Sequence, residues 1–299
     1  MLHGLCVLAG LISVFLLVEV LYQVIHGASP AISRFGLSFI GHSRWAANFG
    51  DFGAAGPLFG TVASSLMALV IATPLGIAIG LYLSMMAAPP VRAVVGPLVE
   101  MLAAIPSVIV GFWGVDVLAP FVAKHLEPFL HDAFGFIPLF GPPQTTGLSV
   151  FSAGLGLALM ILPIVAALSR DLFLTVPIDL KEGAAALGAT RWEIIRGVVL
   201  PTTISGVAAA TVLGLGRALG EAIAVLQIIG DGSGIHSSLF LPGISLASSV
   251  ANNFQYSENK LEIPALFYLA LILLVIGLTT SLLARWIAGR FDVQRTLAR

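Results

Sequence analysis

The sequence predicts an all-α integral membrane protein with six transmembrane helices. Of its 299 residues, 58% are hydrophobic and only 10% are charged, whereas a soluble domain carries about 25% charged residues. The mean hydropathy is +1.02, and the apolar residues form long runs with most of the charges between them. A soluble fold of this composition would expose large apolar patches, so lipid is the expected solvent.

Six stretches are long and apolar enough to cross a bilayer, which takes about 20 residues in a helix. They are Leu5–Ile25, Thr61–Ser84, Ala93–Leu118, Leu148–Leu168, Thr203–Gly230 and Ile263–Ala288. The first stretch is longer than the apolar part of a secretory signal and has no Lys or Arg before it, so we expect it to be retained. Pro106, inside the third, cannot donate a backbone hydrogen bond and is expected to kink or break that helix.

The distribution of basic residues predicts that both termini are cytoplasmic. In that orientation nine Lys and Arg residues lie in the inner segments, four lie in the outer loops, and Arg217 lies within a span. Short cytoplasmic loops carry the excess of Lys and Arg in multi-pass proteins. We therefore expect a first span with its external segment at 1–60, a five-span core at 61–290 and a cytoplasmic tail at 291–299.

Composition and motifs argue against several other functions. The net charge of −1 gives no reason to expect a nucleic-acid partner. None of the lysines stands in the G-x-x-x-x-G-K-[ST] pattern that holds nucleotide phosphates, so any ATP would be bound by another chain. The sequence also lacks H-E-x-x-H. We expect no catalytic residue and no metal ligand.

The segment at 177–201 predicts a short helix–turn–helix on the cytoplasmic side. Asp179 and Glu182 have the spacing of a capping box, and so do Thr190 and Glu193. Gly188, between them, suits the left-handed end of a helix. The apolar stripe of this segment is too short to cross a membrane. An amphipathic connector that rests on lipid or on the protein's own spans is the simplest interpretation of this pattern.

The fifth stretch carries two opposite charges within the membrane, Arg217 and Glu221. They are four residues apart, so on a continuous helix they share a face and can pair. Gly216 and Gly220 give the same helix a small surface that another helix can approach closely. Two interpretations remain open: a structural ion pair, or an arginine that lines a pathway and binds an anion while Glu221 orients it. Ser107, beside the expected break, offers a hydroxyl to the same pathway.

The residues from Glu182 to Pro201 resemble the EAA motif of ABC importer permeases. Glu182-Gly183-Ala184, then Gly188 and then Leu200-Pro201 follow the spacing of that family. Gly183 stands where the family has alanine, and Val198 stands where it has isoleucine. The resemblance implies a coupling helix that docks on an ATPase subunit, with these coupling residues: Glu182, Gly183, Ala184, Gly188, Leu200 and Pro201.

Two further segments, Met101–Gly114 and Leu213–Val225, resemble the PstC family of phosphate importer permeases. Gly216 favours that family over its sister permease PstA, which usually reads A-R-A-A-G-E here. Ala222 departs from the family, which usually has threonine after the glutamate, and so removes a hydroxyl near the expected pathway. The resemblance extends over nearly the whole chain. It implies a permease core of the MetI-like type and a subunit of an ATP-driven importer of inorganic phosphate in the bacterial inner membrane.

The same resemblance implies the partners. They are a second, PstA-like permease, two PstB-like ATPase subunits that use ATP and Mg²⁺, an external PstS-like phosphate-binding protein and membrane lipid, with no nucleic acid and no cofactor in this chain. A permease for sulfate, molybdate or a phosphonate remains an alternative, because an arginine suits each of these anions. A secondary anion transporter or channel is an alternative from another class, and it would need no ATPase.

Overall fold

A computed structural model describes residues 2–232, 234–255, 257 and 260–290. Within this part of the chain, six helices are long and apolar enough to cross a membrane. They are Gly4–Phe35, Ala55–Met86, Ser107–Phe134, Val150–Thr175, Arg191–Gly220 and Glu262–Trp286. The prediction of six spans in an all-α fold is confirmed, although several boundaries differ from those expected. The predicted tail at 291–299 lies outside the described residues.

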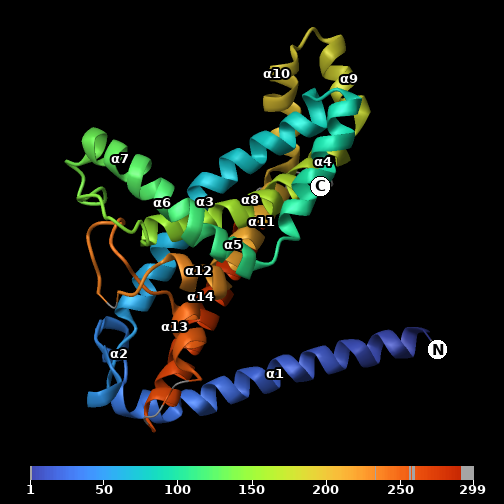
Figure 1. The fold of residues 1–299 in the computed structure, drawn as a ribbon. Helices are drawn as coiled ribbons and strands as arrows, with labels where there is room; N and C mark the ends of the chain where they lie inside the picture. Colours follow the sequence, from blue (N-terminus) through green and yellow to red (C-terminus); the bar gives the residue numbers. More distant parts are fainter. Residues whose placement is uncertain (1, 233, 256, 258–259, 291–299) are drawn as a thin grey trace.

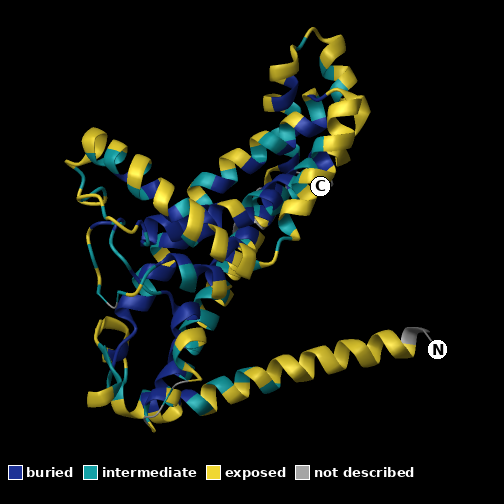
Figure 2. Ribbon diagram, viewed as in Figure 1, coloured by how far each residue is buried: buried dark blue, intermediate teal, exposed yellow. Residues whose placement is uncertain are grey.

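Helix α1 (Leu2–Phe35) reaches away from the rest of the molecule (Figure 1). None of the residues in its most apolar window is buried, and Figure 2 shows most of the helix as exposed. Its last turns pack on α14 (Glu262–Arg290), where Ala28 and Ala31 are fully buried. The first span is therefore anchored at one end, and its apolar side chains are left for lipid or another subunit to cover.

A small cap of short elements follows α1 and covers one end of the bundle. It consists of α2 (Ser38–Gly41), a hairpin of β1 (Trp45–Ala46) and β2 (Asp51–Phe52), and a 3₁₀ turn at Ala47–Phe49 between the strands. The Phe39 ring stacks on Tyr268 of α14 with 4.5 Å between ring centroids. The Tyr268 hydroxyl donates to the Gly36 carbonyl at 3.1 Å. These contacts fix the end of α1 to the beginning of the last span.

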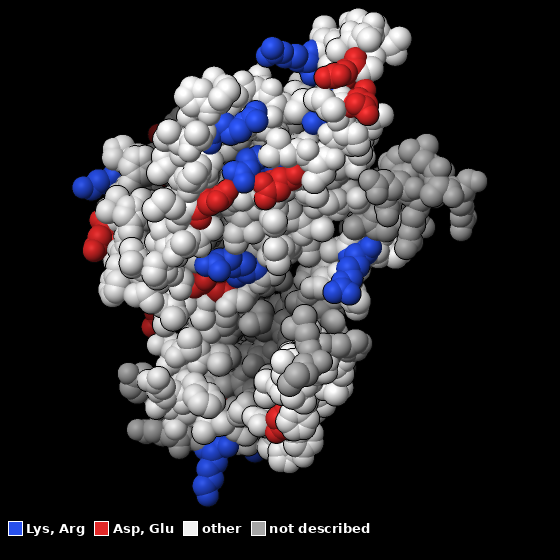
Figure 3. Space-filling model, turned by 90° about the vertical axis from the view of Figure 1, so that its right-hand side faces the viewer, with Lys and Arg blue, Asp and Glu red and all other residues white. Residues whose placement is uncertain are grey.

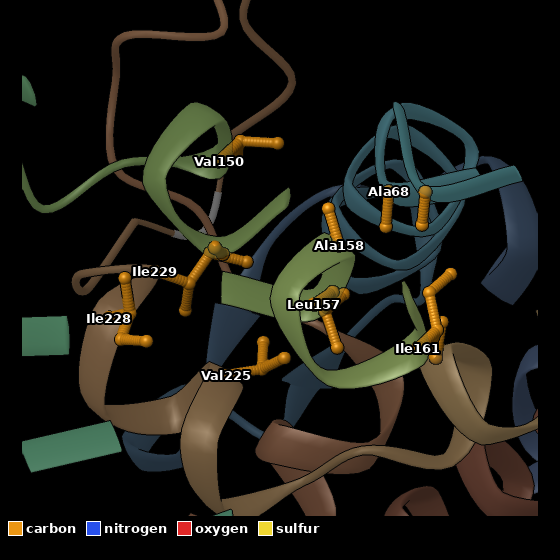
Figure 4. Close-up of a cluster of buried hydrophobic side chains, with 11 residues drawn as sticks. Ala68, Val150, Leu157, Ala158, Ile161, Val225, Ile228 and Ile229 are labelled. Atoms are coloured by element: carbon orange, nitrogen blue, oxygen red, sulfur yellow. The ribbon is translucent and has the colours of Figure 1, made fainter. Parts of the chain in front are cut away.

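The centre of the bundle is formed by α3 (Ala55–Leu81) and α8 (Val150–Thr175). A π-helical turn at Tyr82–Met86 continues α3. Figure 4 shows one cluster of buried side chains in which Leu157 and Ile161 of α8 face Ala68 of α3 and Val225. Small residues line the contact between α3 and α8. A Cβ at Gly80 would lie 2.9 Å from the Arg170 amide nitrogen and 3.1 Å from the Ala166 carbonyl oxygen.

The third predicted span is not one helix from Ala93 to Leu118. Helix α4 (Pro89–Ala103) ends before Pro106, and a new helical run begins at Ser107. That run consists of α5 (Ser107–Trp113), a π turn (Gly114–Leu118), α6 (Ala119–Phe121), a second π turn (Val122–Leu126) and α7 (Glu127–Phe134). Pro106 breaks the helix as predicted, but the run continues to Phe134, well beyond the predicted end at Leu118.

The fifth predicted span, Thr203–Gly230, is also interrupted. Helix α11 (Leu200–Gly220) ends at Glu221, whose backbone is extended at φ −72° and ψ 118°. A short helix, α12 (Ile223–Ile228), follows, and α13 (Leu246–Asn253) lies between the fifth and sixth predicted spans. Two of the six predicted stretches therefore contain a break, and each break lies at one end of an observed span.

The segment between α8 and α11 forms a helical hairpin at one end of the molecule (Figure 1). Its helices are α9 (Ile178–Ala186) and α10 (Arg191–Ile194), and a π turn at Ile195–Val199 joins α10 to α11. This arrangement confirms the predicted helix–turn–helix. Since α10, the π turn and α11 are contiguous, a single helical run extends from Arg191 to Gly220.

We predict that Gly80→Ala destabilises the protein by up to about 2 kcal/mol. Overpacking against fixed backbone costs about 1–3 kcal/mol, and the better helix propensity of alanine offsets about 1 kcal/mol of it. Thermal unfolding of the purified protein in detergent measures the change.

Gly10→Ala is the matched control, because a Cβ at Gly10 meets no atom within 4 Å. It should leave the unfolding temperature unchanged or raise it. Equal unfolding temperatures for the two variants would contradict the close packing of α3 on α8.

Candidate transport site

The two helix breaks lie close together in the bundle. Val110 of α5, Ala224 of α12 and Met160 of α8 form one buried cluster, and Ile105 from the first break packs against it. Arg217, one turn before the second break, lines a cavity of about 20 Å³ together with Ala103 and Ile105. Discontinuous helices of this kind mark substrate sites in many transporters. The structure therefore brings Arg217 to the junction of the two breaks.

Arg217 and Glu221 do not form the predicted ion pair. Among the described residues, the ionic contacts within 4.0 Å involve other side chains, and Arg217 has no hydrogen-bonding partner. The prediction assumed a continuous helix, but the chain leaves the helix at Glu221 and the i,i+4 relation is lost. The arginine is left exposed and free to meet a ligand or another subunit.

Glu221 instead supports the second half of its broken helix. Its Oε1 accepts a hydrogen bond from the Ala224 amide at 3.3 Å, in the first turn of α12. The first amides of a helix have no partner within the helix. A carboxylate that accepts from one of them stabilises the new helix start. The structure thus places Glu221 at the break, as a cap.

Arg217 also lines a larger hollow of about 770 Å³, between α8, α11 and α14. Gly216 forms part of the same wall. A Cβ at Gly216 or Gly220 would meet no atom of this chain within 4 Å. The small surface predicted for helix approach is therefore not used by any described helix of this chain, and it stays open to another molecule.

Ser107 is the first residue of α5 and is partly buried. It does not line either of the hollows that contain Arg217; its neighbours Ile105 and Val110 line the smaller one. Ser107 therefore lies beside the junction and not in the wall around Arg217.

The hairpin of α9 and α10 is built mostly as the sequence predicts. Thr190 and Glu193 form a reciprocal capping box: the Thr190 amide donates to Glu193 Oε2 at 2.7 Å, and the Glu193 amide donates to Thr190 Oγ1 at 3.4 Å. Gly188 has the left-handed φ of 86°. The first predicted capping box is wrong, because α9 begins at Ile178 and Asp179 lies inside it without capping it.

The expected coupling residues differ in their exposure. Ala184 packs against the cluster of Phe173, Val199 and neighbouring side chains, whereas Glu182 and Gly183 are exposed. A Cβ at Gly183 would meet nothing within 4 Å. Glycine weakens a helix interior by about 1 kcal/mol relative to alanine, so nothing in this chain's own packing explains it. The outer face of α9 is thus shaped for contact with something else.

Leu200 and Pro201 begin α11, where Leu200 is partly buried against the same cluster and Pro201 is exposed. Lys181 joins α9 to the end of α8, since its Nζ donates to the Phe173 carbonyl at 3.3 Å. Partial burial lowers the pKa of Lys181 below its usual value. These contacts hold the hairpin to the ends of two spans.

No local sequence pattern indicates the ion pair that holds α4. Arg170 Nη2 of α8 lies 2.8 Å from Glu100 Oε1 of α4 and 2.8 Å from Asp171 Oδ1. Arg170 is mostly buried, with 18% of its side chain exposed. Glu100 and Arg170 are far apart in the sequence, so no local spacing could have identified them. The pair fixes the first half of the broken span against the central helix.

Most of the surface on the face shown in Figure 3 is uncharged, and the Lys, Arg, Asp and Glu side chains form small separate groups on it. No group of His, Cys, Asp and Glu that could hold a metal ion occurs among the residues described.

Comparisons with known proteins identify the class of this fold. The model of the family "Binding-protein-dependent transport system inner membrane component" matches residues 72–293. A permease from a bacterial alginate ABC transporter has the same fold, with a TM-score of 0.60, 15% identity and coverage of 94% of this chain and 95% of that one. The MetNI methionine ABC transporter gives a TM-score of 0.54 at 19% identity, over 80% of this chain and 94% of that one. The chain belongs to this family of ABC importer permeases.

Curated relatives place the chain more narrowly. The phosphate transport system permease protein PstC of Pasteurella multocida is 42% identical over 93% of this chain and 87% of its own length. The PstC of Haemophilus influenzae is 40% identical over 93% of this chain and 89% of its own. A probable PstC from Methanocaldococcus jannaschii is 33% identical over 88% and 85%, respectively. The protein is a member of the PstC group, and it is a multi-pass inner-membrane protein.

We predict that Glu221→Ala lowers the free energy of unfolding by about 1 kcal/mol, the typical cost of losing a helix cap. Glu221→Gln keeps an acceptor oxygen and should lose less. Thermal unfolding in detergent compares the two variants with the parent protein. Equal losses for alanine and glutamine would contradict the capping role.

Proposed function

We propose that this chain is the transmembrane permease subunit of an ATP-driven inorganic phosphate importer. The observation that carries the proposal is Arg217, an intramembrane guanidinium without an ionic partner among the described residues. An arginine at the centre of a span costs about 2.5–3.5 kcal/mol on insertion scales. A chain keeps such a residue where it meets water, protein or an anion. The identity to permeases named for phosphate transport supports phosphate as that anion.

Arginine suits a phosphate pathway because the N–H donors of its planar guanidinium group match the oxygens of the anion. The guanidinium group also stays positively charged at all physiological pH values. We assign the direct contact to Arg217. We assign Glu221 and Ser107 to the pathway as well. Glu221 stabilises the break between α11 and α12 by accepting a hydrogen bond from the Ala224 amide. Ser107 offers a hydroxyl at the break between α4 and α5. An importer must also release its cargo, and the nearby carboxylate keeps the anion from binding too tightly.

The partners in this proposal follow the family. A second, PstA-like permease would cover the open face of α11, where a Cβ at Gly216 or Gly220 would meet no described atom within 4 Å. Two PstB-like subunits would bind ATP and Mg²⁺, since this chain has no nucleotide-binding loop in its sequence. A PstS-like protein would deliver phosphate from outside. Both termini and the α9–α10 hairpin would then lie in the cytoplasm.

The mechanism is alternating access. Closure of the ATPase subunits would move the hairpin of α9 and α10, whose exposed face carries Glu182 and Gly183. Because one helical run joins Arg191 to Gly220, that movement reaches Arg217 directly. The spans rock and open outward to accept phosphate, and hydrolysis returns them to the inward-open state.

A permease for another oxyanion would use the same parts, and the arginine alone does not separate it from a phosphate permease. Uptake of sulfate or molybdate in place of phosphate would change the transported anion but would leave the proposed ATP-driven mechanism unchanged. A secondary anion transporter would work without an ATPase, and the exposed α9 helix would then have no docking role.

We predict that Arg217→Gln lowers phosphate uptake at least about tenfold, because it removes a charge-assisted contact worth about 1.5–3 kcal/mol. Radiolabelled uptake is measured in cells that lack their own high-affinity system and express this chain with its three partners. Arg34→Gln, on the exposed α1, is the matched control and should retain parental uptake. Normal uptake by an intact Arg217→Gln complex would exclude the direct pathway role.

We predict that Glu182→Lys abolishes uptake while the permease remains folded, because the side chain is exposed and has no partner among the described residues to lose. Co-purification with the ATPase subunits and ATP hydrolysis stimulated by the loaded binding protein are measured beside uptake. Unchanged uptake in this variant would exclude ATPase coupling through α9.

A further inference from the structure

The hollow beside Arg217 contains a second arginine. Arg285 of α14 lines the same 770 Å³ space, with Ser281 one turn before it. The other lining residues are apolar or glycine: Ile164, Ala209, Val212, Leu213, Gly216 and Ala284. No described carboxylate lines the hollow, and neither arginine has an ionic or hydrogen-bonding partner among the described residues. The space is therefore lined by two positive charges that no residue in the described part of the chain neutralises.

The two arginines lie at different depths. Helices α11 and α14 run in opposite directions and pack on each other (Figure 1). The hollow extends along α11 from Ala209 to Arg217, which is about 12 Å of helix. Because the helices are antiparallel, Ser281 lies toward the level of Arg217 and Arg285 lies toward the level of Ala209. Arg285 is thus at the end of the hollow nearer the α9–α10 hairpin.

An apolar wall strengthens the attraction between a cation and an anion, since the local dielectric is lower than that of water. Two guanidinium groups in such a space offer donors that match the geometry of a tetrahedral oxyanion. The Ser281 hydroxyl donates to the Gly277 carbonyl at 2.7 Å, so the two guanidinium groups supply the anion donors of this hollow. The chemistry that fits this hollow is a phosphate group with more than one negative charge.

We propose that Arg285 and Arg217 form a two-arginine phosphate site, in which Arg285 receives the anion on its way from Arg217 to the cytoplasmic side. The proposal rests on the proposed function, and it adds Arg285 as a second binding residue for the transported anion. An anionic phospholipid headgroup presents the same phosphate chemistry, so the test separates a free anion from a lipid.

The first measurement is uptake of radiolabelled phosphate by the whole complex in proteoliposomes, for the parent, Arg285→Gln, Arg285→Lys and Arg34→Gln. We expect Arg285→Gln to lower the maximal rate about tenfold, the effect of one lost charge-assisted contact. The half-saturating external phosphate concentration should stay within about twofold, because the binding protein sets it. Lysine should recover part of the rate, and Arg34→Gln should match the parent. A parental rate for Arg285→Gln overturns the proposal.

The second measurement does not depend on transport. Cys6 is the single cysteine of the chain, so Cys6→Ser together with Ser281→Cys puts one thiol in the hollow. Anionic and cationic thiol reagents of equal size are compared. We expect the anionic reagent to react faster, Arg285→Gln to lower the ratio of the two rates about tenfold, and inorganic phosphate to slow labelling. An unchanged ratio, or labelling indifferent to phosphate, overturns the proposal.

Lipid composition separates the two sources of phosphate. If the transported anion occupies the site, phosphate slows labelling equally in vesicles with and without phosphatidylglycerol. Labelling blocked by phosphatidylglycerol and unaffected by free phosphate would assign the hollow to a lipid and overturn the proposal. A parent complex without phosphate uptake contradicts the proposed function, and the labelling ratio then decides on the two-arginine site by itself.

Discussion

The lack of water in the bilayer core is the constraint on which the rest of this structure depends. Backbone amides and carbonyls there must be satisfied within the protein, so continuous helices are the rule and breaks need local support. In this chain the helical backbone is interrupted at 104–106 and at 221–222, each time next to the end of a span. At the first, Pro106 has no amide to satisfy; at the second, Glu221 accepts from the Ala224 amide. Both breaks pack beside α8, and this contact gives the bundle a polar junction at Arg217.

Apolar runs and local motifs were enough to predict the six spans, the Thr190–Glu193 capping box and the left-handed Gly188. Each depends on residues within a few positions of one another. The prediction of an Arg217–Glu221 ion pair is wrong although the spacing is equally local. It requires a helix that continues through Glu221, and α11 ends at Gly220. Gly220, just before the break, is the one local residue that could indicate the end of the helix. The same glycine also suits a helix-packing surface, so it does not predict the break by itself. The Glu100–Arg170 pair depends on how α4 docks on α8, and no sequence spacing encodes that contact.

Several surfaces of this chain make physical sense only in an assembly. The apolar residues of α1 are exposed along most of the helix, Arg217 faces an open hollow, and α9 presents Gly183 to empty space. Lipid can cover the first, but an unpaired arginine facing lipid is costly, and a glycine in an exposed helix has no benefit to its own chain. The three features lie on different elements. A permease that pairs with a second permease and an ATPase would explain all three.

The arrangement of the helices also indicates how an external force could reach the anion. Arg191 to Gly220 is one helical run, so Arg217 lies about 39 Å along the same rod from the start of α10. Lys181 and Ala184 fasten α9 to the ends of α8 and α11, and the capping box fixes the start of α10. No flexible loop among these contacts would take up a displacement of α9, so the displacement would be passed on to α11. In the proposed mechanism it would tilt α11 against α8 and α14, the other two walls of the hollow that holds both arginines, and so would change the shape of the proposed anion site.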